Sequence, residues 1–467
     1  MQKDTTVHDQ NTNLVLSKTK NLLKITSNIL TKKTSKDLAD YSWVDRLWKW
    51  ADENKIPDLQ WIENSNDDEG GYWEGISRDR KKLLNSTKLN IAGNDLIRLP
   101  KEIGNLRNLT ELDLSYNQLI EIPKEIGNLT NLTELLLWKN QLIKLPKEVY
   151  DLINLKKLNL NANSSIKLSK EIGNLINLTE LNLSGNPLIE YYSEIGDLID
   201  LTDKQLIKLP KEIGNLTKLK ILDLSFRLIE FPKEIGNLTN LTELDLNSNH
   251  LTELPKEIYT FINLTKINLR YNKLIKLPKE IGNLTNLTEL DLRNNQLIEL
   301  PKKIGNLTNL IKLNLKNNQL IELPKKIGNL TNLTELDLKY NQLTKLPKKI
   351  GNLTNLTELD LTSSQLAKLP KEVGNLTNLT ELDLSYNKLI KLPKEIGNLT
   401  NLEKFILAGN NLKELPKGIE DLTNLTELDL KYNPNLILTQ KQIGWIQKLK
   451  KEDTDDKIMI DDVYLEE

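Results

Sequence analysis

One stretch decides the fold. From Leu333 to Asn355 the chain reads Leu-Thr-Glu-Leu-Asp-Leu-Lys-Tyr-Asn-Gln-Leu-Thr-Lys-Leu-Pro-Lys-Lys-Ile-Gly-Asn-Leu-Thr-Asn. This unit of 23 residues recurs, with small changes, from about Ser86 to about Leu449. Its first leucines alternate with charged residues, which indicates a short strand with one buried face. A period of roughly 20 to 29 residues beginning L-x-x-L-x-L-x-x-N is typical of a stacked solenoid.

The second half of the unit turns the chain and brings it back. Asn341 follows the strand, where an amide can donate to and accept from backbone groups of adjacent turns, so the asparagine column predicts a hydrogen-bonded spine. Pro347 and Gly351 bracket a compact turn, with proline expected at the first helical position and glycine expected where φ is positive. The column consists of Asn94, Asn117, Asn140, Asn163, Asn186, Asn249, Asn272, Asn295, Asn318, Asn341, Asn387, Asn410 and Asn433.

The predicted fold class is an α/β solenoid. A strand on one side and a compact turn on the other curve the stack into a horseshoe, with a parallel concave β-sheet and short helical or 3-10 turns on the convex side. An open end would expose the core, so a small helical N-terminal cap is expected as well.

The pattern resembles the leucine-rich repeat family over about 365 of the 467 residues. The Leu-Pro-x-x-Ile-Gly-x-Leu half of each unit resembles the Ras-suppressor-like and plant intracellular Ras-group-related subclass, which has 23-residue repeats. This resemblance implies a cytoplasmic scaffold that binds partner proteins on its concave sheet. The lysine, asparagine and isoleucine bias indicates an AT-rich genome, so we expect a bacterial source.

Four segments are predicted. Residues 1–40 are polar and expected to be partly disordered, and residues 41–85 form a tryptophan-rich N-terminal cap whose tryptophans pack on the first repeat. Residues 86–449 form a solenoid of about 16 repeats that is irregular at 201–240, where one unit is short and the next lacks its asparagine. We expect a kink or local loosening across residues 190–230. Residues 450–467 are an acidic C-terminal tail, expected to be partly disordered.

Composition excludes several classes of function. The net charge is −1, and its 64 basic and 65 acidic residues are interspersed, which argues against a nucleic-acid footprint or a polybasic membrane anchor. The chain has no cysteine and only two histidines, His8 and His250, and it lacks phosphate-loop and kinase motifs. We therefore expect no enzyme activity, cofactor or metal.

The chain also shows no targeting or membrane-spanning segment. Its first residues lead into no apolar run of signal-peptide length, and no stretch approaches the ~20 apolar residues of a membrane span. The expected compartment is the cytoplasm, with secretion without a cleavable signal left open, and the expected form is a monomer.

The first candidate site is an acidic block in repeats 12 to 14. At the third position of the unit, glutamate and lysine alternate in the preceding repeats, which is a ladder of opposite charges across neighbouring strands. The alternation then fails, and only Lys339 is basic within the block. We predict that the block receives a basic segment of a partner; the alternative is a solvated face left by copying one repeat. The block and the tyrosines beside it are Glu335, Asp337, Tyr340, Glu358, Asp360, Glu381, Asp383 and Tyr386.

A second candidate lies at repeats 2 and 3. Tyr116, Leu136 and Trp138 place apolar and aromatic surface on a concave face that is charged elsewhere. Tryptophan and tyrosine are enriched at interface hot spots. The alternative is that the N-terminal cap folds over this surface and buries it.

These observations predict a non-enzymatic scaffold that recognises a partner protein on its concave face, with a role in intracellular signalling. The alternative is an exported bacterial virulence or adhesion factor that binds a host protein with the same chemistry.

Overall fold

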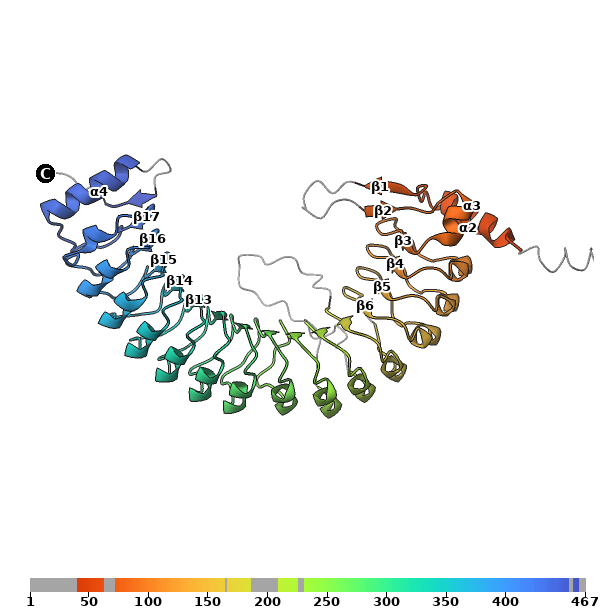
Figure 1. Cartoon of the computed structure of the whole chain (residues 1–467), viewed down its shortest axis with the longest axis horizontal. Helices are drawn as coiled ribbons and strands as arrows, with labels where there is room; N and C mark the ends of the chain where they lie inside the picture. Colours follow the sequence, from red (N-terminus) through yellow and green to blue (C-terminus); the bar gives the residue numbers. More distant parts are fainter. Residues whose placement is uncertain are drawn as a thin grey trace, which may run out of the picture.

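The protein is an open arc of stacked turns, with a capping element at each end (Figure 1). The structure, a computed structural model, describes residues 40–62, 72–163, 166–185, 209–225, 231–452 and 457–461. The predicted disordered segment at residues 1–40 lies almost wholly outside these described residues. Within them the predicted fold class is confirmed: the chain forms a curved solenoid with a parallel sheet on its inner face and short turns on its outer face.

The inner face is one parallel sheet of sixteen strands, β3 to β18, arranged in sequence order. Each strand is short because only the L-x-L core of the unit alternates between buried and partly exposed side chains. Equivalent residues pair across neighbouring strands, as Leu313 does with Leu336. The strands are β3 Lys88–Asn90, β4 Glu111–Asp113, β5 Glu134–Leu136, β6 Lys157–Asn159, β7 Glu180–Asn182, β8 Ile221–Asp223, β9 Glu243–Asp245, β10 Lys266–Asn268, β11 Glu289–Asp291, β12 Lys312–Asn314, β13 Glu335–Asp337, β14 Glu358–Asp360, β15 Glu381–Asp383, β16 Lys404–Ile406, β17 Glu427–Asp429 and β18 Ile458–Met459.

The outer face consists of 3-10 turns. The proline of the unit stands one residue before each turn and not at the first helical position: Pro347 has extended backbone angles, φ −69° and ψ 144°, and the turn begins at Lys348. The turns are η1 Lys101–Asn105, η2 Lys124–Asn128, η3 Lys147–Asp151, η4 Lys170–Asn174, η5 Lys211–Asn215, η6 Lys233–Asn237, η7 Lys256–Thr260, η8 Lys279–Asn283, η9 Lys302–Asn306, η10 Lys325–Asn329, η11 Lys348–Asn352, η12 Lys371–Asn375, η13 Lys394–Asn398 and η14 Ile419–Asp421.

The glycine inside most turns, which Tyr150 and Tyr259 replace in η3 and η7, is needed for a different reason than predicted. Gly351 does not have a positive φ, so the expectation of a left-handed residue there is wrong. The next turn instead lies directly against its Cα: a Cβ added to Gly351 would lie 2.9 Å from Cβ of Glu372 and closer still to the carbonyl oxygen of that residue. Glycine is required because neighbouring turns touch.

The core is a single apolar column that runs through the stack. In the unit that begins at Leu333, residues Leu336, Leu338, Leu343 and Ile350 are all buried, and they come from the strand, the return and the turn. Most of the described units bury the equivalent residues, so the repeat period directly sets the position of the core.

The asparagine column forms hydrogen bonds between adjacent units. Asn341 Oδ1 accepts from the backbone N–H of Leu320 at 3.1 Å, and its Nδ2 donates to the carbonyl oxygens of Leu315 and Leu338 at 3.0 and 2.9 Å. Asn94 is half-buried and donates to Ala92 in its own turn, while Asn186 lies outside the described residues. The buried members are Asn117, Asn140, Asn163, Asn249, Asn272, Asn295, Asn318, Asn341, Asn387, Asn410 and Asn433.

The N-terminal end is covered by helices α2, Ser42–Glu53, and α3, Arg80–Asn85, and by a two-stranded sheet of β1, Gln60–Ile62, and β2, Tyr72–Glu74. Helix α2 buries Val44, Leu47 and Ala51 in the common core.

The tryptophans of this cap divide into two groups. Trp43, Trp48 and Trp50 pack against the core as predicted. Trp61 and Trp73 do not: they contact each other edge to face across β1 and β2, and about half of each remains exposed.

The C-terminal end is closed by helix α4, Gln440–Glu452, which buries Trp445, Ile446 and Leu449. The tail was expected to be partly disordered, yet Ile458 and Met459 form β18 and extend the sheet beyond β17. Among the described residues, no helix is long and apolar enough to cross a membrane.

The irregular region does not interrupt the sheet. Strand β7 pairs directly with β8, with Leu181 opposite Leu222, so the short unit that begins at Leu201 places no strand between them. Its turn η5 stacks between η4 and η6. Most of the predicted loosening falls on residues 186–208 and 226–230, which lie outside the described residues.

Candidate functional site

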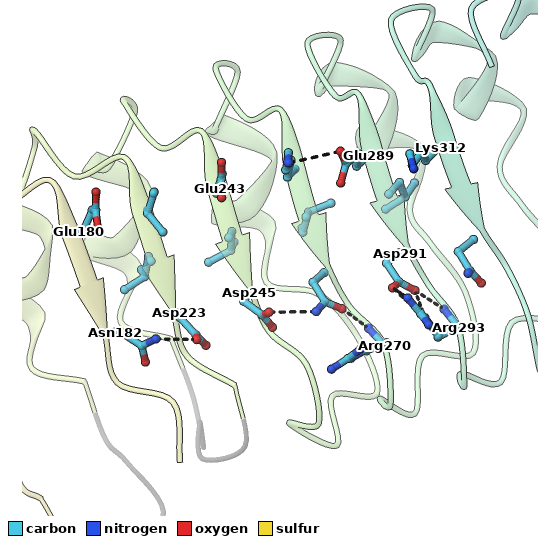
Figure 2. A pocket seen from close by; sticks show the side chains of 18 of the residues that line it. Glu180, Asn182, Asp223, Glu243, Asp245, Arg270, Glu289, Asp291, Arg293 and Lys312 are labelled. Carbon is cyan, nitrogen blue, oxygen red and sulfur yellow. Dashed lines mark hydrogen bonds and ion pairs between the residues drawn. The ribbon is translucent and has the colours of Figure 1, made fainter. Parts of the chain in front are cut away.

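The concave sheet is hollowed along its middle. A trough of about 660 Å³ follows β6 to β13, and its floor consists of the charged and amide side chains of the strands (Figure 2). Glu335 and Asp337 of the predicted acidic block lie at one end of it. Glu358, Asp360 and the rest of the block continue past that end on β14 and β15.

Over most of the trough, neighbouring strands balance one another, apart from β8, where Ile221 stands opposite Glu243 and Asp223 opposite Asp245. Lys266 Nζ lies 3.3 Å from Glu289 Oε1, which is the charge ladder that the sequence predicts. Two residues further along the strands, Asn268 Nδ2 donates to Asp245 Oδ2 at 2.9 Å, and Asn182 Nδ2 donates to Asp223 Oδ2 at 3.0 Å (Figure 2). Alternating amides and carboxylates thus satisfy each other before any partner arrives.

The aspartates of the acidic block also have a structural role that the sequence alone did not indicate. Asp337 Oδ1 accepts from the backbone N–H of Lys339 at 3.0 Å, and Asp360 accepts in the same way from Thr362 at 2.8 Å. Asparagine makes the same bond in other units, as Asn314 does with Lys316. Either residue supplies the accepting oxygen, so this hydrogen bond does not need a negative charge, and Leu136 and Ile406 occupy the same position without a side-chain oxygen.

The acidic block is where the balance between strands fails at both positions over three successive strands. Glu335, Glu358 and Glu381 stand opposite one another in register, and so do the three aspartates. Burial and then the neighbouring Glu335 and Glu381 raise the pKa of Glu358 above its usual value. Burial and then Asp360 raise the pKa of Asp337 in the same way.

Few cations offset this charge. Lys312 Nζ lies 2.6 Å from Glu335 Oε1 at one border, whereas Lys339 Nζ lies as far as 3.9 Å from Asp360 Oδ2. At the other border Lys404 pairs with Glu427, 3.4 Å away, although it also stands opposite Glu381 in the sheet. The block therefore keeps an excess of negative charge in the described structure.

The tyrosines beside the block occupy a strained backbone position. Tyr340 and Tyr386 have φ of 56° and 54°, a region that bulky residues rarely adopt, and glycine occupies the equivalent position as Gly93 and Gly409. Both rings are nevertheless largely exposed, at 47% and 59%. The same positive φ recurs at this position in other units, as at Asn294 and Asn317, so the backbone angle belongs to the repeat and the exposed rings are what distinguish these two residues.

The three residues of the second candidate site lie together near β5, and none of them is buried. The rings of Tyr116 and Trp138 meet edge to face with centroids 4.1 Å apart, and Lys139 Nζ lies 4.5 Å from the Tyr116 ring. Tyr116 is 46% exposed, while Leu136 and Trp138 are half-buried. The described part of the cap does not bury this aromatic pair. The pair lies near the β6 end of the trough, and the acidic block begins at its β13 end.

One feature of the concave face was not predicted. The residue that follows each strand by two positions is basic in four successive units, from β10 to β13. Arg293 is bound by Asp291, 2.6 Å away, whereas Arg270 has a buried Nε without a hydrogen-bond partner among the described residues (Figure 2). Comparison of the seventh position of every unit would have found this row, which is Arg270, Arg293, Lys316 and Lys339.

Metal chemistry finds no support in this geometry. Among the described residues, no group of three or more acidic, histidine or cysteine side chains is placed to hold a metal ion. The carboxylates of the block lie side by side along the sheet and do not converge on a point.

A curved parallel sheet, a buried asparagine spine and turns on the outer side define a leucine-rich repeat solenoid, a fold typical of protein-binding scaffolds without catalysis. The family profile described as "Leucine-rich repeat region" matches residues 78–197, 197–295, 256–359, 290–388 and 348–451. The chain therefore belongs to the leucine-rich repeat family. No curated protein matches it.

Solved structures share the architecture. A leucine-rich repeat protein of Leptospira interrogans is 39% identical, with 82% of this chain and 100% of that one covered and a TM-score of 0.70. The leucine-rich effector protein YopM of Yersinia pestis is 27% identical over 77% and 88% of the two chains, with a TM-score of 0.56. An internalin of Listeria monocytogenes, InlF, is 25% identical over 69% and 87%, with a TM-score of 0.57.

Proposed function

We propose that the protein is a scaffold that binds a partner protein on its concave face, with the acidic block receiving a basic segment of that partner. The observation that carries the proposal is the contrast along the sheet. Between β9 and β12 carboxylates stand beside lysines or amides, but from β13 to β15 carboxylates face carboxylates. Burial in such a row raises the pKa of Glu358, so a cation from outside would relieve a repulsion that already exists.

The exposed tyrosines support the same surface. Tyr340 and Tyr386 offer aromatic area beside the carboxylates, a combination suited to lysine and arginine side chains. Leucine-rich repeat proteins generally bind proteins, so this interpretation agrees with the family.

The test uses the chain's own alternatives at each position. A variant with Glu335, Glu358 and Glu381 changed to lysine, and Asp337, Asp360 and Asp383 changed to asparagine, keeps the backbone hydrogen bonds because asparagine makes them in other units. Lysine likewise occupies the third position at Lys266 and Lys312. The variant should therefore fold.

Two binding readouts follow. Proteins captured from the source cell by the wild type and lost with the variant would be purified and titrated, and a fluorescent lysine- and arginine-rich peptide would be titrated by anisotropy. We expect binding to weaken roughly tenfold to a hundredfold in the variant, and to weaken with added salt in the wild type.

A matched control separates the block from net charge. Changing Glu111, Glu180 and Glu243 to lysine, and Asp113, Asp223 and Asp245 to asparagine, makes the same substitutions elsewhere on the sheet. This control should retain the basic peptide and the captured partner. Equal losses from both variants would show that the site is not the acidic block.

The aromatic pair is a second docking point on the same face. Trp138 and Tyr116 would contact apolar or aromatic side chains of the partner, and Trp138→Ala with Tyr116→Ala should weaken binding by more than tenfold if this end is used. A partner whose affinity is unchanged by this pair of substitutions would be assigned to the acidic end alone.

The setting of this binding is also proposed. The likeness to the Leptospira protein over its full length supports a bacterial source, and the Leu-Pro-x-x-Ile-Gly-x-Leu units support the Ras-suppressor-like subclass with 23-residue repeats. A cytoplasmic, monomeric scaffold with a signalling role is the first candidate. An exported factor binding a host protein is the second, favoured by the likeness to an effector protein of Yersinia pestis. Fractionating the source culture, with detection of the protein in cells and in medium, separates the two.

A further inference from the structure

Net positive charge is concentrated in one part of the stack, where acidic residues are few, although the whole chain is nearly neutral. Residues 264–355 carry sixteen lysines and arginines against seven acidic residues, a net charge of +9, while the remaining residues together carry −10. The interspersion expected from composition therefore holds for the chain as a whole but not along the arc.

Three consecutive turns of this region share one departure from the repeat. The turns η9, η10 and η11 begin Lys-Lys, whereas turns such as η8 and η12 on either side begin Lys-Glu. All six lysines are exposed, and none of them makes an ion pair in the described structure. We call them the lysine patch: Lys302, Lys303, Lys325, Lys326, Lys348 and Lys349.

The turns lie against one another on the outer rim of the arc, in its green-to-teal part (Figure 1). A Cβ on Gly305 would lie 2.8 Å from Cβ of Lys326, and one on Gly328 would lie 2.8 Å from Cβ of Lys349. This close packing places the lysines of successive turns side by side. From each Lys-Lys pair to the end of its unit, only neutral residues follow.

Acidic groups border the lysine patch but do not interrupt it. Glu280 and Glu372 belong to the flanking turns, and Glu299 and Glu322 lie on the flank before the turns, where Glu322 pairs with Lys345 at 3.7 Å. The patch is thus a coherent positive surface on the side of the molecule opposite the acidic block.

We infer that the lysine patch docks the protein on an anionic membrane surface. The outer rim is convex and cannot enclose a ligand, so its partner must be extended. The cations are all lysines, which act as hydrated point charges, and the patch lacks the arginine forks and aromatic rings that read nucleic acids. Clusters of about four to eight basic residues are the ordinary size of a lipid-headgroup site.

Docking by this rim would direct the concave face away from the lipid. The acidic block on β13 to β15 would then stay open to a partner in solution, since sheet and turns are opposite sides of the same units. The inference does not depend on the proposed binding of a partner by the acidic block, because it concerns the other face.

The test is vesicle co-sedimentation of the full chain at low salt, with phosphatidylcholine vesicles that contain or lack phosphatidylglycerol. The variant Lys303→Glu, Lys326→Glu and Lys349→Glu restores the Lys-Glu sequence of neighbouring turns, so it should fold, as a thermal melt would confirm. Each lysine near an anionic surface contributes about fivefold to partitioning, so the variant should lose at least about a hundredfold.

The matched control is Lys124→Glu, Lys147→Glu and Lys170→Glu, the same charge change in exposed lysines of η2, η3 and η4. It should bind like the wild type. Equal loss in both variants, or wild-type binding that does not need phosphatidylglycerol, would overturn the inference.

Two further measurements distinguish a membrane from two other possible partners of the lysine patch, nucleic acid and a second copy of this chain. The wild type and variants would be titrated with fluorescent duplex DNA and examined by sedimentation velocity. Loss of DNA binding or of self-association in the patch variant, with vesicle binding absent throughout, would assign the patch to nucleic acid or to a second copy and would overturn the membrane assignment.

Discussion

Substituting alanine for a turn glycine tests whether close contact between neighbouring turns is what requires glycine. A Cβ on Gly305 would lie 2.8 Å from Cβ of Lys326, about 1 Å inside normal carbon contact, and closer still to the carbonyl oxygen of that residue. The obstacle is backbone, so η10 must move as a whole. Such overpacking costs about 1–3 kcal/mol, offset by the roughly 0.5–1 kcal/mol that alanine gains over glycine in the unfolded chain. We expect Gly305→Ala to destabilise the protein by about 1–2 kcal/mol.

The chain contains its own control for this prediction. Gly236 occupies the same place in η6, but a Cβ there would meet nothing closer than 3.5 Å, because η7 lies further away. Gly236→Ala should therefore be neutral or stabilise by about 0.5–1 kcal/mol. Urea denaturation followed by circular dichroism, with hydrogen exchange over η9 and η10, measures both variants. Equal stability of the two alanine variants would refute the close-contact explanation.

Four further predictions concern stability and pH. Asn318→Ala should destabilise by about 1–3 kcal/mol because it leaves the buried N–H of Leu297 without its acceptor, while the carbonyl groups of Leu292 and Leu315 still accept from Asn295 and Asn341. Asn318→Ser should cost less, since Ser364 already occupies this column and donates to Leu338, and thermal melts compare the two. Tyr259→Phe should stabilise by about 1 kcal/mol, because the Tyr259 hydroxyl is buried without a hydrogen-bond partner among the described residues, and an unchanged melting temperature would show that the hydroxyl is satisfied. Tyr386→Gly should stabilise by about 1 kcal/mol by relieving a φ of 54°, yet weaken partner binding, and weaker binding without the gain would mean that the tyrosine is not strained. The pKa of Glu358 is higher in the folded than in the unfolded protein, so the folded state binds more protons and the stability of the fold decreases as pH rises through the folded-state pKa. Glu358→Gln should therefore raise the melting temperature at pH 7 but not at a pH below the unfolded pKa of about 4.3. Equal effects at the two pH values would contradict the repulsion.

The sequence predicts the parts of this fold that depend on one unit and its period. The L-x-L alternation places strands such as Glu335–Asp337, and the asparagine position places the spine, because both follow from which side chain each step of the unit turns inward. Register between strands follows as well, since equal units must stack equivalent residues.

What the sequence could not predict depends on distances between units. The reason for Gly351 is the spacing of adjacent turns, which no single unit encodes. Strand β7 pairs directly with β8 because the short unit between them adds no strand to the sheet, which the sequence of that unit does not reveal. Strand β18 forms because the chain returns to the sheet after α4. Both are tertiary choices between alternatives that the same local pattern permits.

The candidate site divides in the same way. The carboxylates of the block could be placed from the sequence because register alone brings Glu335, Glu358 and Glu381 together. That the aspartates also close the strand ends, and that Tyr386 is held at a strained φ, needed coordinates. In other units asparagine makes the same hydrogen bond through its side-chain oxygen. The fold therefore uses one accepting oxygen of each aspartate, and the negative charge of the carboxylate is free for binding.

In a chain of nearly identical units, departures from the unit carry the information about function, because stacking alone accounts for everything the units share. The two charge departures overlap in one unit, which carries Glu335 and Asp337 on the inner face and Lys348 and Lys349 on the outer face. Copying of one repeat would carry both charges to every unit together, but each spans three units with a different end: the acids run from β13 to β15 and the lysines from η9 to η11. Separate boundaries imply separate causes, so the inner and outer substitutions should change different binding reactions. A partner titration that responds to the acidic block and not to the lysines, beside vesicle binding with the opposite response, is the result that this separation requires.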